Sequence, residues 1–407
     1  MIRKFHISVS AVVFLFCIFC NPLAAQGDAG IILRSRAMIK AGKTADAVNI
    51  LTAELERTRS EKLLTQRADA YLLSGNLSAA INDLNEANKL SEHSGDYGLA
   101  QAYAMKGDVK TSLYHLSQNL GSSYKKTEKE LMLNPAFSRF ENSPEWRQFW
   151  KKDWYSFPER AAAEIEYNVN SGNNAEALNI LKELANNYPE SEELLYSEVL
   201  IFISSKQFND AVSAALKLSE SDPGNEKYLR ILAKAQYAQL NYAGASATYT
   251  RLIDAGVPDA DLFLQRAGCY RKTREKEKSL RDIEKYLELY PEDKTALSLA
   301  GKVESESGDN LKAIEYFSRN LSLHPDDKEC YIDRANSYLA AKSWAWAVKD
   351  YSMSLDLNPE DPDAWLNKGL AQLGSGKTAD ACHDFRKAYS LGNQKATPYI
   401  SKHCLDR

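Results

Sequence analysis

Two cysteine–histidine pairs near the end of the sequence are the residues best suited to chemistry. Cys382 and His383 lie in the stretch ACHDF, and His403 and Cys404 lie in SKHCLDR. Two thiolates and two imidazoles are a common zinc-ligand set. Neighbouring residues on a helix point about 100° apart, however, so neither pair is well placed to share one ion, and we expect no metal. A disulfide between Cys382 and Cys404 and a pair of free thiols are the remaining alternatives.

No other stretch has the spacing of a catalytic or cofactor site. The histidines show no HExxH spacing, and the sequence contains no GxSxG, Walker or GxGxxG motif in a suitable context. Carboxylates are numerous, but they fall on predicted helix faces that meet water, where charged side chains are usually solvated surface. The sequence therefore predicts a protein that is not an enzyme and that needs no cofactor.

Composition and charge exclude further classes of function. The 407 residues include 51 Lys+Arg and 55 Asp+Glu, which gives a net charge of −4. Nucleic-acid binding usually needs a concentrated basic surface, so we expect no nucleic-acid partner. Ala, Leu, Lys and Glu are abundant, and these residues favour helices.

The first residues have the pattern of an export signal. A short basic start, MIRK, precedes an apolar stretch at 7–20 that is too short to span a bilayer, and small residues follow at Ala24 and Ala25. We interpret residues 1–25 as a signal peptide that is cleaved after Ala25, which leaves no transmembrane segment. Disulfides persist in the oxidising compartments that such signals lead to. A lipid anchor on Cys17 or Cys20 and a retained membrane anchor are the alternatives.

One phrase returns every 34 residues in the second half of the chain. LELYPED (287–293), LSLHPDD (321–327) and LDLNPED (355–361) share the pattern apolar-x-apolar-x-Pro-acid-Asp. When each proline is set at place 32 of a 34-residue frame, small residues recur at places 8 and 20, namely Ala267, Gly301, Ala335, Ser279, Ala313 and Ala347. Places 4, 7, 8 and 11 share one helix face and places 20, 24 and 27 another, which predicts two helices in each unit.

This pattern resembles the tetratricopeptide repeat. The resemblance implies an all-α fold, a right-handed α-solenoid of stacked helix-turn-helix repeats, because one helix pair cannot bury both of its apolar faces alone. We expect an N-terminal block of about three repeats at 26–126 and a C-terminal block of about seven repeats at 158–395. Residues 396–407 would form a capping segment with a C-terminal capping helix.

The stretch 127–157 breaks the frame between the two blocks. It is dense in aromatic residues, including Trp146, Trp150 and Trp154. We interpret it as a non-repeat helical spacer that packs its aromatic side chains against both neighbouring blocks. An exposed aromatic docking surface is the alternative.

The resemblance also bears on the cysteines. The stretch ACHDFRKAYSLGNQKATPYISKHC is similar to the closing stretch of many exported bacterial tetratricopeptide proteins, in which paired cysteines recur. It therefore favours the Cys382–Cys404 disulfide, which would hold the capping segment on the last repeat and contribute about 3 kcal/mol. Cys269 and Cys330 fall in different repeats, and we expect them to be buried and too far apart to bridge.

In the family that this sequence resembles, the first helix of each pair lines a concave groove that binds extended peptides or partner helices. The residues at groove-facing places form an apolar patch beside a basic one: Tyr196, Leu200, Lys227, Arg230, Lys234, Tyr237, Arg271 and Lys272. Such a surface would suit a negatively charged peptide or chain terminus. The alternative is a set of ordinary solvated lysines with packed tyrosines.

These patterns together predict a non-enzymatic protein–protein interaction scaffold of the cell envelope of a Gram-negative bacterium. We expect it in the periplasm or associated with the outer membrane, where it would bind a partner peptide or helix during envelope assembly or secretion. The alternative is an outer-membrane-associated glycan or nutrient-binding protein, in which tryptophans between 146 and 154 would stack on sugars. Peripheral membrane association is compatible with both functions.

Overall fold

The computed structural model describes residues 27–404, and every regular element in that range is a helix. Three helical hairpins come first: α1 (Asp28–Lys40) with α2 (Thr44–Leu55), α3 (Glu61–Leu73) with α4 (Leu77–Leu90), and α5 (Asp96–Lys106) with α6 (Val109–Leu120). Three short helices follow: α7 (Glu128–Met132), the 3-10 helix η2 (Ser138–Phe140) and α8 (Pro144–Phe149). The predicted signal peptide, residues 1–25, lies outside the described residues.

Seven further hairpins complete most of the chain. They are α9 (Phe157–Asn170) with α10 (Asn174–Asn187), α11 (Glu192–Ser204) with α12 (Phe208–Ser221), α13 (Glu226–Ala238) with α14 (Tyr242–Asp254), α15 (Asp261–Lys272) with α16 (Lys276–Leu289), α17 (Lys294–Glu306) with α18 (Asn310–Leu323), α19 (Lys328–Ala340) with α20 (Trp344–Leu357), and α21 (Pro362–Gly374) with α22 (Thr378–Ser390). The short η3 (Gln394–Ala396) and α23 (Thr397–His403) pack on α22. The predicted all-helical solenoid of stacked repeats is confirmed.

The recurring phrase marks the junction between successive hairpins. Its last residue, Asp293, Asp327 or Asp361, is the N-cap of the next helix, and its carboxylate accepts a hydrogen bond from a backbone N–H of the first turn. The preceding helix ends two residues before the proline, which cannot continue a helix. The phrase therefore ends one hairpin and begins the next.

The small residues at place 8 allow the two helices of a hairpin to approach closely. A Cβ atom on Gly301 would lie 2.5 Å from the ring of Phe317, and one on Gly369 would lie 2.6 Å from the ring of Phe385. Both rings occupy place 24 and are buried. A larger residue at place 8 would therefore push the helices apart in a densely packed core.

A second recurring contact, which we did not predict, joins an arginine at place 7 to an aspartate at place 23. The pairs are Arg67–Asp83, Arg266–Asp282 and Arg334–Asp350, each with two hydrogen bonds of 2.7 to 2.9 Å, and Lys368–Asp384 takes the same places in the last hairpin. Each arginine also donates through Nη1, over 3.0 Å, to a hydroxyl of the preceding hairpin: Thr52, Thr250 or Ser318. One guanidinium thus holds three helices together.

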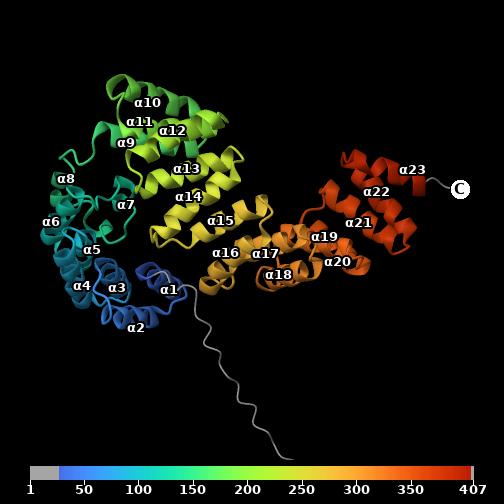
Figure 1. Ribbon diagram of the computed structural model, residues 1–407, viewed down its shortest axis with the longest axis horizontal. Helices are drawn as coiled ribbons and strands as arrows, with labels where there is room; N and C mark the ends of the chain where they lie inside the picture. The colour runs from blue at the N-terminus through green and yellow to red at the C-terminus, as the bar shows by residue number, and fades with distance from the viewer. Residues whose placement is uncertain (1–26, 405–407) are drawn as a thin grey trace, which may run out of the picture.

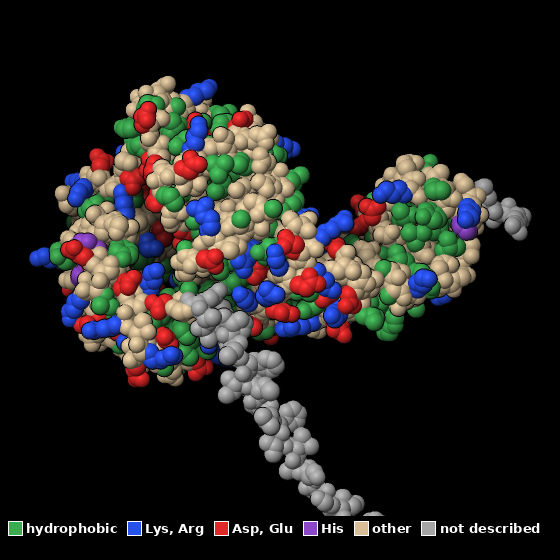
Figure 2. All heavy atoms as spheres, viewed as in Figure 1, with side chains coloured by type: hydrophobic (Ala, Val, Ile, Leu, Met, Phe, Trp, Pro, Cys, Tyr) green, Lys and Arg blue, Asp and Glu red, His purple; other side chains and the backbone are tan. Residues whose placement is uncertain are grey.

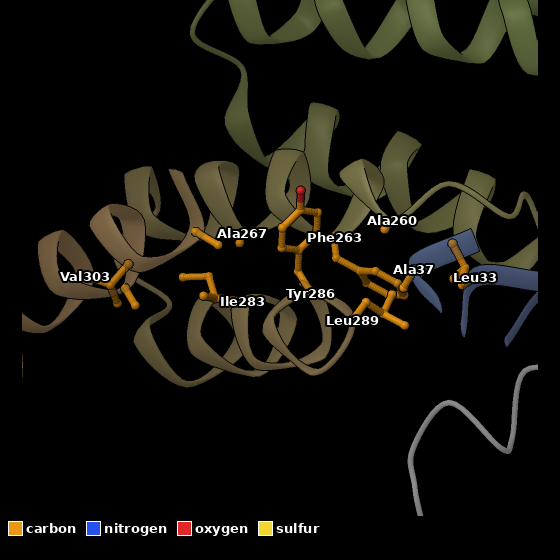
Figure 3. Packing of buried hydrophobic residues seen from close by; sticks show 11 residues of the cluster. Leu33, Ala37, Ala260, Phe263, Ala267, Ile283, Tyr286, Leu289 and Val303 are labelled. Atoms are coloured by element: carbon orange, nitrogen blue, oxygen red, sulfur yellow. The ribbon is translucent and has the colours of Figure 1, made fainter. Parts of the chain in front are cut away.

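The hairpins up to α16 curve until α1 meets α15 and α16, as Figure 1 shows. Leu33 and Ala37 of α1 belong to the same buried cluster as Phe263, Tyr286 and Leu289 (Figure 3). The Arg36 guanidinium donates a hydrogen bond of 2.5 Å to the Pro258 carbonyl, and the Lys40 ammonium lies 4.8 Å from the centre of the Tyr290 ring. We call α1–α16 the closed turn and this contact the seam.

Helices α17–α23 extend away from the closed turn as an arm, seen in orange and red in Figure 1. The arm remains attached through the same buried cluster, which includes Ala296, Ala300 and Val303 of α17. The molecule is therefore a closed turn with a shorter, open stack of hairpins attached to it.

The arginine–aspartate pairs are expected to contribute strongly to stability. Asp350 is almost fully buried, so Arg334→Met would leave an unpaired carboxylate in the core, at a cost of about 3–5 kcal/mol. Urea unfolding and hydrogen exchange in α19 and α20 measure this loss. Arg57→Met is the control, because Arg57 pairs with Glu54 on the exposed surface and its loss should cost less than about 1 kcal/mol. Equal effects of the two substitutions would contradict the assignment.

Candidate functional site

The inner side of the closed turn contains two adjoining cavities, which we call together the lumen. The first has a volume of about 930 Å³ and is lined by α1, α3, α5 and the segment 119–130. The second has a volume of about 740 Å³ and is lined mainly by α9, α11 and α13. Ser123, Lys125 and Glu130 line both cavities. In Figure 2 the larger body is hollowed on the side that faces the viewer, and acidic and basic side chains lie in the hollow.

Basic side chains without acidic partners distinguish the lumen. Five of its cations have no carboxylate among the described residues within 4.0 Å: Arg36, Lys40, Lys62, Lys227 and Lys234. Two of the lumen's carboxylates are paired, since Glu130 contacts Lys126 and Glu226 contacts Arg230, while Glu61, Asp69 and Glu166 have no cation within 4.0 Å among the described residues. Unpaired cations therefore outnumber unpaired carboxylates in the lumen, although the whole chain is slightly acidic.

Asp69 shows how far the protein encloses this space. Its side chain reaches solvent, and it lines the first cavity of the lumen. Desolvation raises the pKa of Asp69 to about 6, although the charges of Arg36 and Lys126 act in the opposite direction. Asp69 is therefore a carboxylate that can change its charge near neutral pH.

Lys227 lines the second cavity, and desolvation shifts its pKa as it does that of Asp69. Its ammonium is 3.9 Å from the centre of the Tyr196 ring, and desolvation lowers the pKa of Lys227 despite the nearby charge of Glu166. A partly desolvated cation beside an aromatic ring can gain from an incoming anion. Lys227 is therefore well placed to bind an acidic group.

The structure brings together only part of the predicted binding set. Tyr196, Leu200, Lys227, Arg230 and Lys234 all line the second cavity. The predicted apolar patch is wrong, however, because Tyr196 is only 8% exposed and Leu200 only 4%. Both pack in the cluster between α11 and α13, and the Tyr196 hydroxyl donates to Glu166 over 3.3 Å.

Arg230 is also less available than we expected. Its guanidinium contacts Glu226 at 2.7 Å and Asp259 at 2.8 Å, which ties α13 to the loop before α15. These two carboxylates balance the positive charge of Arg230 within the protein. Lys227 and Lys234 are thus the basic residues of the predicted set that remain unpaired in this cavity.

The remaining predicted residues lie elsewhere. Arg271 and Lys272 border a separate cavity of about 660 Å³ between the hairpin α15–α16 and α17, and Arg271 pairs with Glu306 at 2.9 Å. Tyr237 lines neither this cavity nor the lumen and packs edge-on against Tyr242. The predicted basic surface is therefore divided between two places.

The lumen residues of the first three hairpins and of the spacer were not predicted from the sequence. Arg36, Lys62, Asp69 and Lys125 lie far from Lys227 along the chain and reach the same space only because the turn closes. No spacing in the sequence indicates that closure. A search for unpaired charges at groove-facing places of every repeat could have found some of them.

The aromatic residues of the spacer form a buried hydrophobic cluster. Trp146 is only 5% exposed and packs against Phe137, Phe140 and Phe149. Trp150 and Trp154 are half-buried, and the Trp154 indole donates to the Phe149 carbonyl over 2.9 Å. The alternative of an exposed tryptophan surface from 146 to 154 is therefore wrong.

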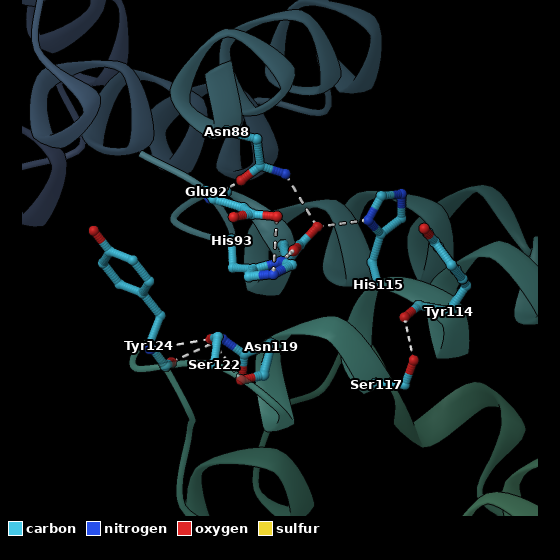
Figure 4. A network of polar contacts seen from close by, with 11 residues as sticks. Asn88, Glu92, His93, Tyr114, His115, Ser117, Asn119, Ser122 and Tyr124 are labelled. Atoms are coloured by element: carbon cyan, nitrogen blue, oxygen red, sulfur yellow. Dashed lines mark hydrogen bonds and ion pairs between the residues drawn. The ribbon is translucent and has the colours of Figure 1, made fainter. Parts of the chain in front are cut away.

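A polar network around Asp96 links three helices of the first block (Figure 4). Its carboxylate contacts His93 at 2.7 Å, His115 at 2.8 Å and Asn88 at 3.1 Å. Burial would raise the pKa of Asp96, but the hydrogen bonds from His115, His93 and Asn88 together lower it. Every member points at this one carboxylate, so the network fixes the turn between α4 and α5 against α6.

The cysteines at the end of the chain are paired in the structure. The Sγ atoms of Cys382 and Cys404 are bonded, and their Cα atoms lie 5.4 Å apart. The bond joins α22 to the end of α23, and Arg386 donates a further hydrogen bond to the Cys404 carbonyl. Cys269 and Cys330 are buried and unpaired, as predicted.

Residues 27–404 contain neither a metal-binding cluster nor a membrane-spanning helix. Within this range no three His, Cys, Asp or Glu side chains are placed to hold a metal ion. No helix of the range is long and apolar enough to cross a bilayer.

The chain is similar to known repeat proteins. Family models described as tetratricopeptide repeat match residues 161–191, 232–294 and 332–396, while curated proteins give no match. A tetratricopeptide repeat protein from Parabacteroides merdae is 19% identical, with 61% of this chain and 99% of that chain covered and a TM-score of 0.48. The C-terminal part of a repeat-containing protein from Cytophaga hutchinsonii is 14% identical, with coverages of 58% and 98% and a TM-score of 0.47. The APC/C hetero-tetramer Cut9-Hcn1 is 15% identical, with coverages of 94% and 91% and a TM-score of 0.46.

The matched residues coincide with hairpins of the structure. Residues 161–191 fall in α9 and α10, residues 232–294 in α13 to α16, and residues 332–396 in α19 to α22. Together with the 34-residue frame and the stacked hairpins, these matches support the resemblance seen in the sequence: residues 161–191, 232–294 and 332–396 of the chain are tetratricopeptide repeats.

Proposed function

We propose that this protein is a non-enzymatic scaffold that holds an acidic, extended segment of a protein partner in the lumen. Tetratricopeptide proteins bind protein or peptide partners through their helical surfaces, which supports the general role. The observation that carries the specific proposal is the set of five lumen cations without acidic partners, described above. A partner's carboxylates would supply the missing charges and steer its approach.

The site favours a flexible segment over a folded domain. The two cavities follow the first helices of successive hairpins, so that the lumen is long and lined by side chains from many repeats. An extended chain can contact the side chains along the whole lumen, whereas a folded domain would contact only those at its rim. Affinity would then come from a few anchors, of which Lys227 and Lys234 are the best placed.

We also propose that the protein acts outside the cytoplasm, in the periplasm or at the outer membrane of a Gram-negative bacterium, in envelope assembly or secretion. The signal-like pattern of residues 1–25 supports export. The disulfide between Cys382 and Cys404 is compatible with it, because such bonds persist in oxidising compartments.

Charge reversal in the lumen should weaken binding of an acidic peptide. Lys227→Glu with Lys234→Glu is expected to weaken the binding of a fluorescent oligoglutamate peptide at least tenfold, which is about 1.4 kcal/mol, and to prevent capture of the partner from envelope extract. Arg230 stays unchanged, because its pairs with Glu226 and Asp259 hold the wall together.

The control for this variant changes charge by the same amount outside the lumen. Lys182→Glu on α10 and Lys349→Glu on α20 alter exposed positions on second helices. Fluorescence anisotropy measures both double variants. If the lumen variant binds as tightly as the control, the lumen is not the binding site.

Binding should strengthen as the pH falls from about 7.5 to about 5.5. Asp69, with its pKa raised to about 6, takes up a proton in this range, and the lumen loses one negative charge while the glutamates of a partner stay ionised. The exposed side chain is screened by water, so we expect a gain of a few-fold. Asp69→Asn should bind at pH 7.5 as wild type does at pH 5.5 and should lose the dependence. A dependence that persists in Asp69→Asn, but not in the exposed control Asp46→Asn, would contradict this role.

Export and the disulfide are tested by the mass of the protein purified from cells. We expect a chain that begins at Gln26 and that weighs two hydrogens less than its fully reduced form. A chain that keeps residues 1–25, or four thiols that react under denaturing conditions, would contradict the proposal.

A further inference from the structure

The seam that closes the turn is small compared with the junctions between successive hairpins. On α1 it consists of Leu33, Arg36, Ala37 and Lys40. A cavity of about 190 Å³ lies within it, bordered by Asp259 and Asp261. Close packing is therefore incomplete at the seam, and its polar contacts are one hydrogen bond and one ammonium–ring contact.

The seam can part without unfolding the hairpin that carries it. Ile32 of α1 packs with Leu51 of α2 and Leu63 of α3, in a cluster separate from that of the seam. This cluster contains no residue of α15 or α16, so α1 would keep its contacts with α2 and α3 if it separated from α15 and α16. The first hairpins could then swing away as a unit.

Closure of the seam changes how a ligand can reach the lumen. The lumen lies on the inner side of a turn whose two ends touch, so a segment with folded domains on both sides cannot enter from the side. A free chain end can thread through, but an internal segment needs a gap in the wall. At the seam the closed turn is joined only by contacts between residues more than 200 positions apart in the sequence, so it can open there without a break in the chain.

We propose that the closed turn encloses the acidic segment it binds, and that the seam between α1 and α15–α16 is the gate through which internal segments enter. This inference rests on the proposed function. Opening of the seam would set the rates of association and dissociation, while the lumen cations would set the affinity.

The first test needs no ligand. Spin labels on cysteines introduced at Lys43, in the turn after α1, and at Glu288, on α16, report the distance across the seam. Burial raises the pKa of Cys269 and of Cys330 to about 12, and Cys382 is paired with Cys404, so the native cysteines should not react with the label. We expect one narrow distance distribution in the wild type. A broad distribution in the wild type would show an open turn and would overturn the proposal.

A substitution in the seam should open it. Leu33→Glu places a charge in the buried contact and near Asp259 and Asp261, so the label distances should lengthen and spread. Met38→Glu changes the same helix outside the seam and should leave the distances unchanged. If Leu33→Glu also leaves them unchanged, the seam residues do not hold the turn closed.

The second test uses ligand topology. An oligoglutamate probe in flexible linkers is prepared with a folded domain at one end and, separately, with a folded domain at both ends. In the wild type, we expect the doubly blocked probe to bind and to leave at least tenfold more slowly than the singly blocked probe. In Leu33→Glu the two probes should have equal rates.

The outcomes separate the gate from the binding site. Equal rates for both probes in the wild type would overturn the gate. Loss of binding of both probes in Lys227→Glu with Lys234→Glu, at unchanged label distances, would support enclosure by the lumen. If neither probe binds to the wild type while the labels show a closed seam, the proposed function is wrong, and the seam cannot be a gate for an acidic segment. The closure of the turn would still hold.

Discussion

The close approach of the two helices within each hairpin is the interaction on which the rest of this structure depends. Glycine or alanine at place 8 lets an aromatic or branched side chain at place 24 lie against the opposite backbone, as Gly301 does for Phe317. Each hairpin then has a fixed thickness and a fixed pair of apolar faces, which only another hairpin can cover. The angle between neighbours follows from this packing, and many small angles add up to the curvature of the closed turn.

The closed turn connects that local packing to the proposed function. Six first helices, α1, α3, α5, α9, α11 and α13, face the lumen, so charges that lie far apart in the sequence meet in one space. Unpaired lysines there cost little while water reaches them, and they remain available to a ligand. Arg230 shows the opposite case, because its two acidic partners make it part of the wall.

The helices and their pairing could be predicted from the sequence, because they depend on contacts within 34 residues. The proline phrase, the aspartate caps and the small residues at places 8 and 20 all act locally. The arginine–aspartate pairs were equally visible, at a spacing of 16 residues in three frames and with lysine in place of arginine in a fourth, but charged residues were assigned to the solvated faces. The burial of Tyr196 and Leu200 and the closure of the turn could not be predicted in this way. They result from the summed orientation of many repeats and from a spacer that follows no frame.

The arginine–aspartate pairs are unevenly distributed, and this has a mechanical consequence. Place 7 holds arginine in the hairpins α3–α4, α15–α16 and α19–α20, but it holds Glu164, Glu198 and Leu232 in the three hairpins from α9 to α14. Those three hairpins lack the arginine–aspartate pair, and their polar contacts are weaker ones such as Tyr196–Glu166 and Thr248–Gln236. Under tension applied at its two ends, the molecule would behave as a spring of unequal stiffness, and the stretch from α9 to α14 would extend before the hairpins α3–α4, α15–α16 and α19–α20.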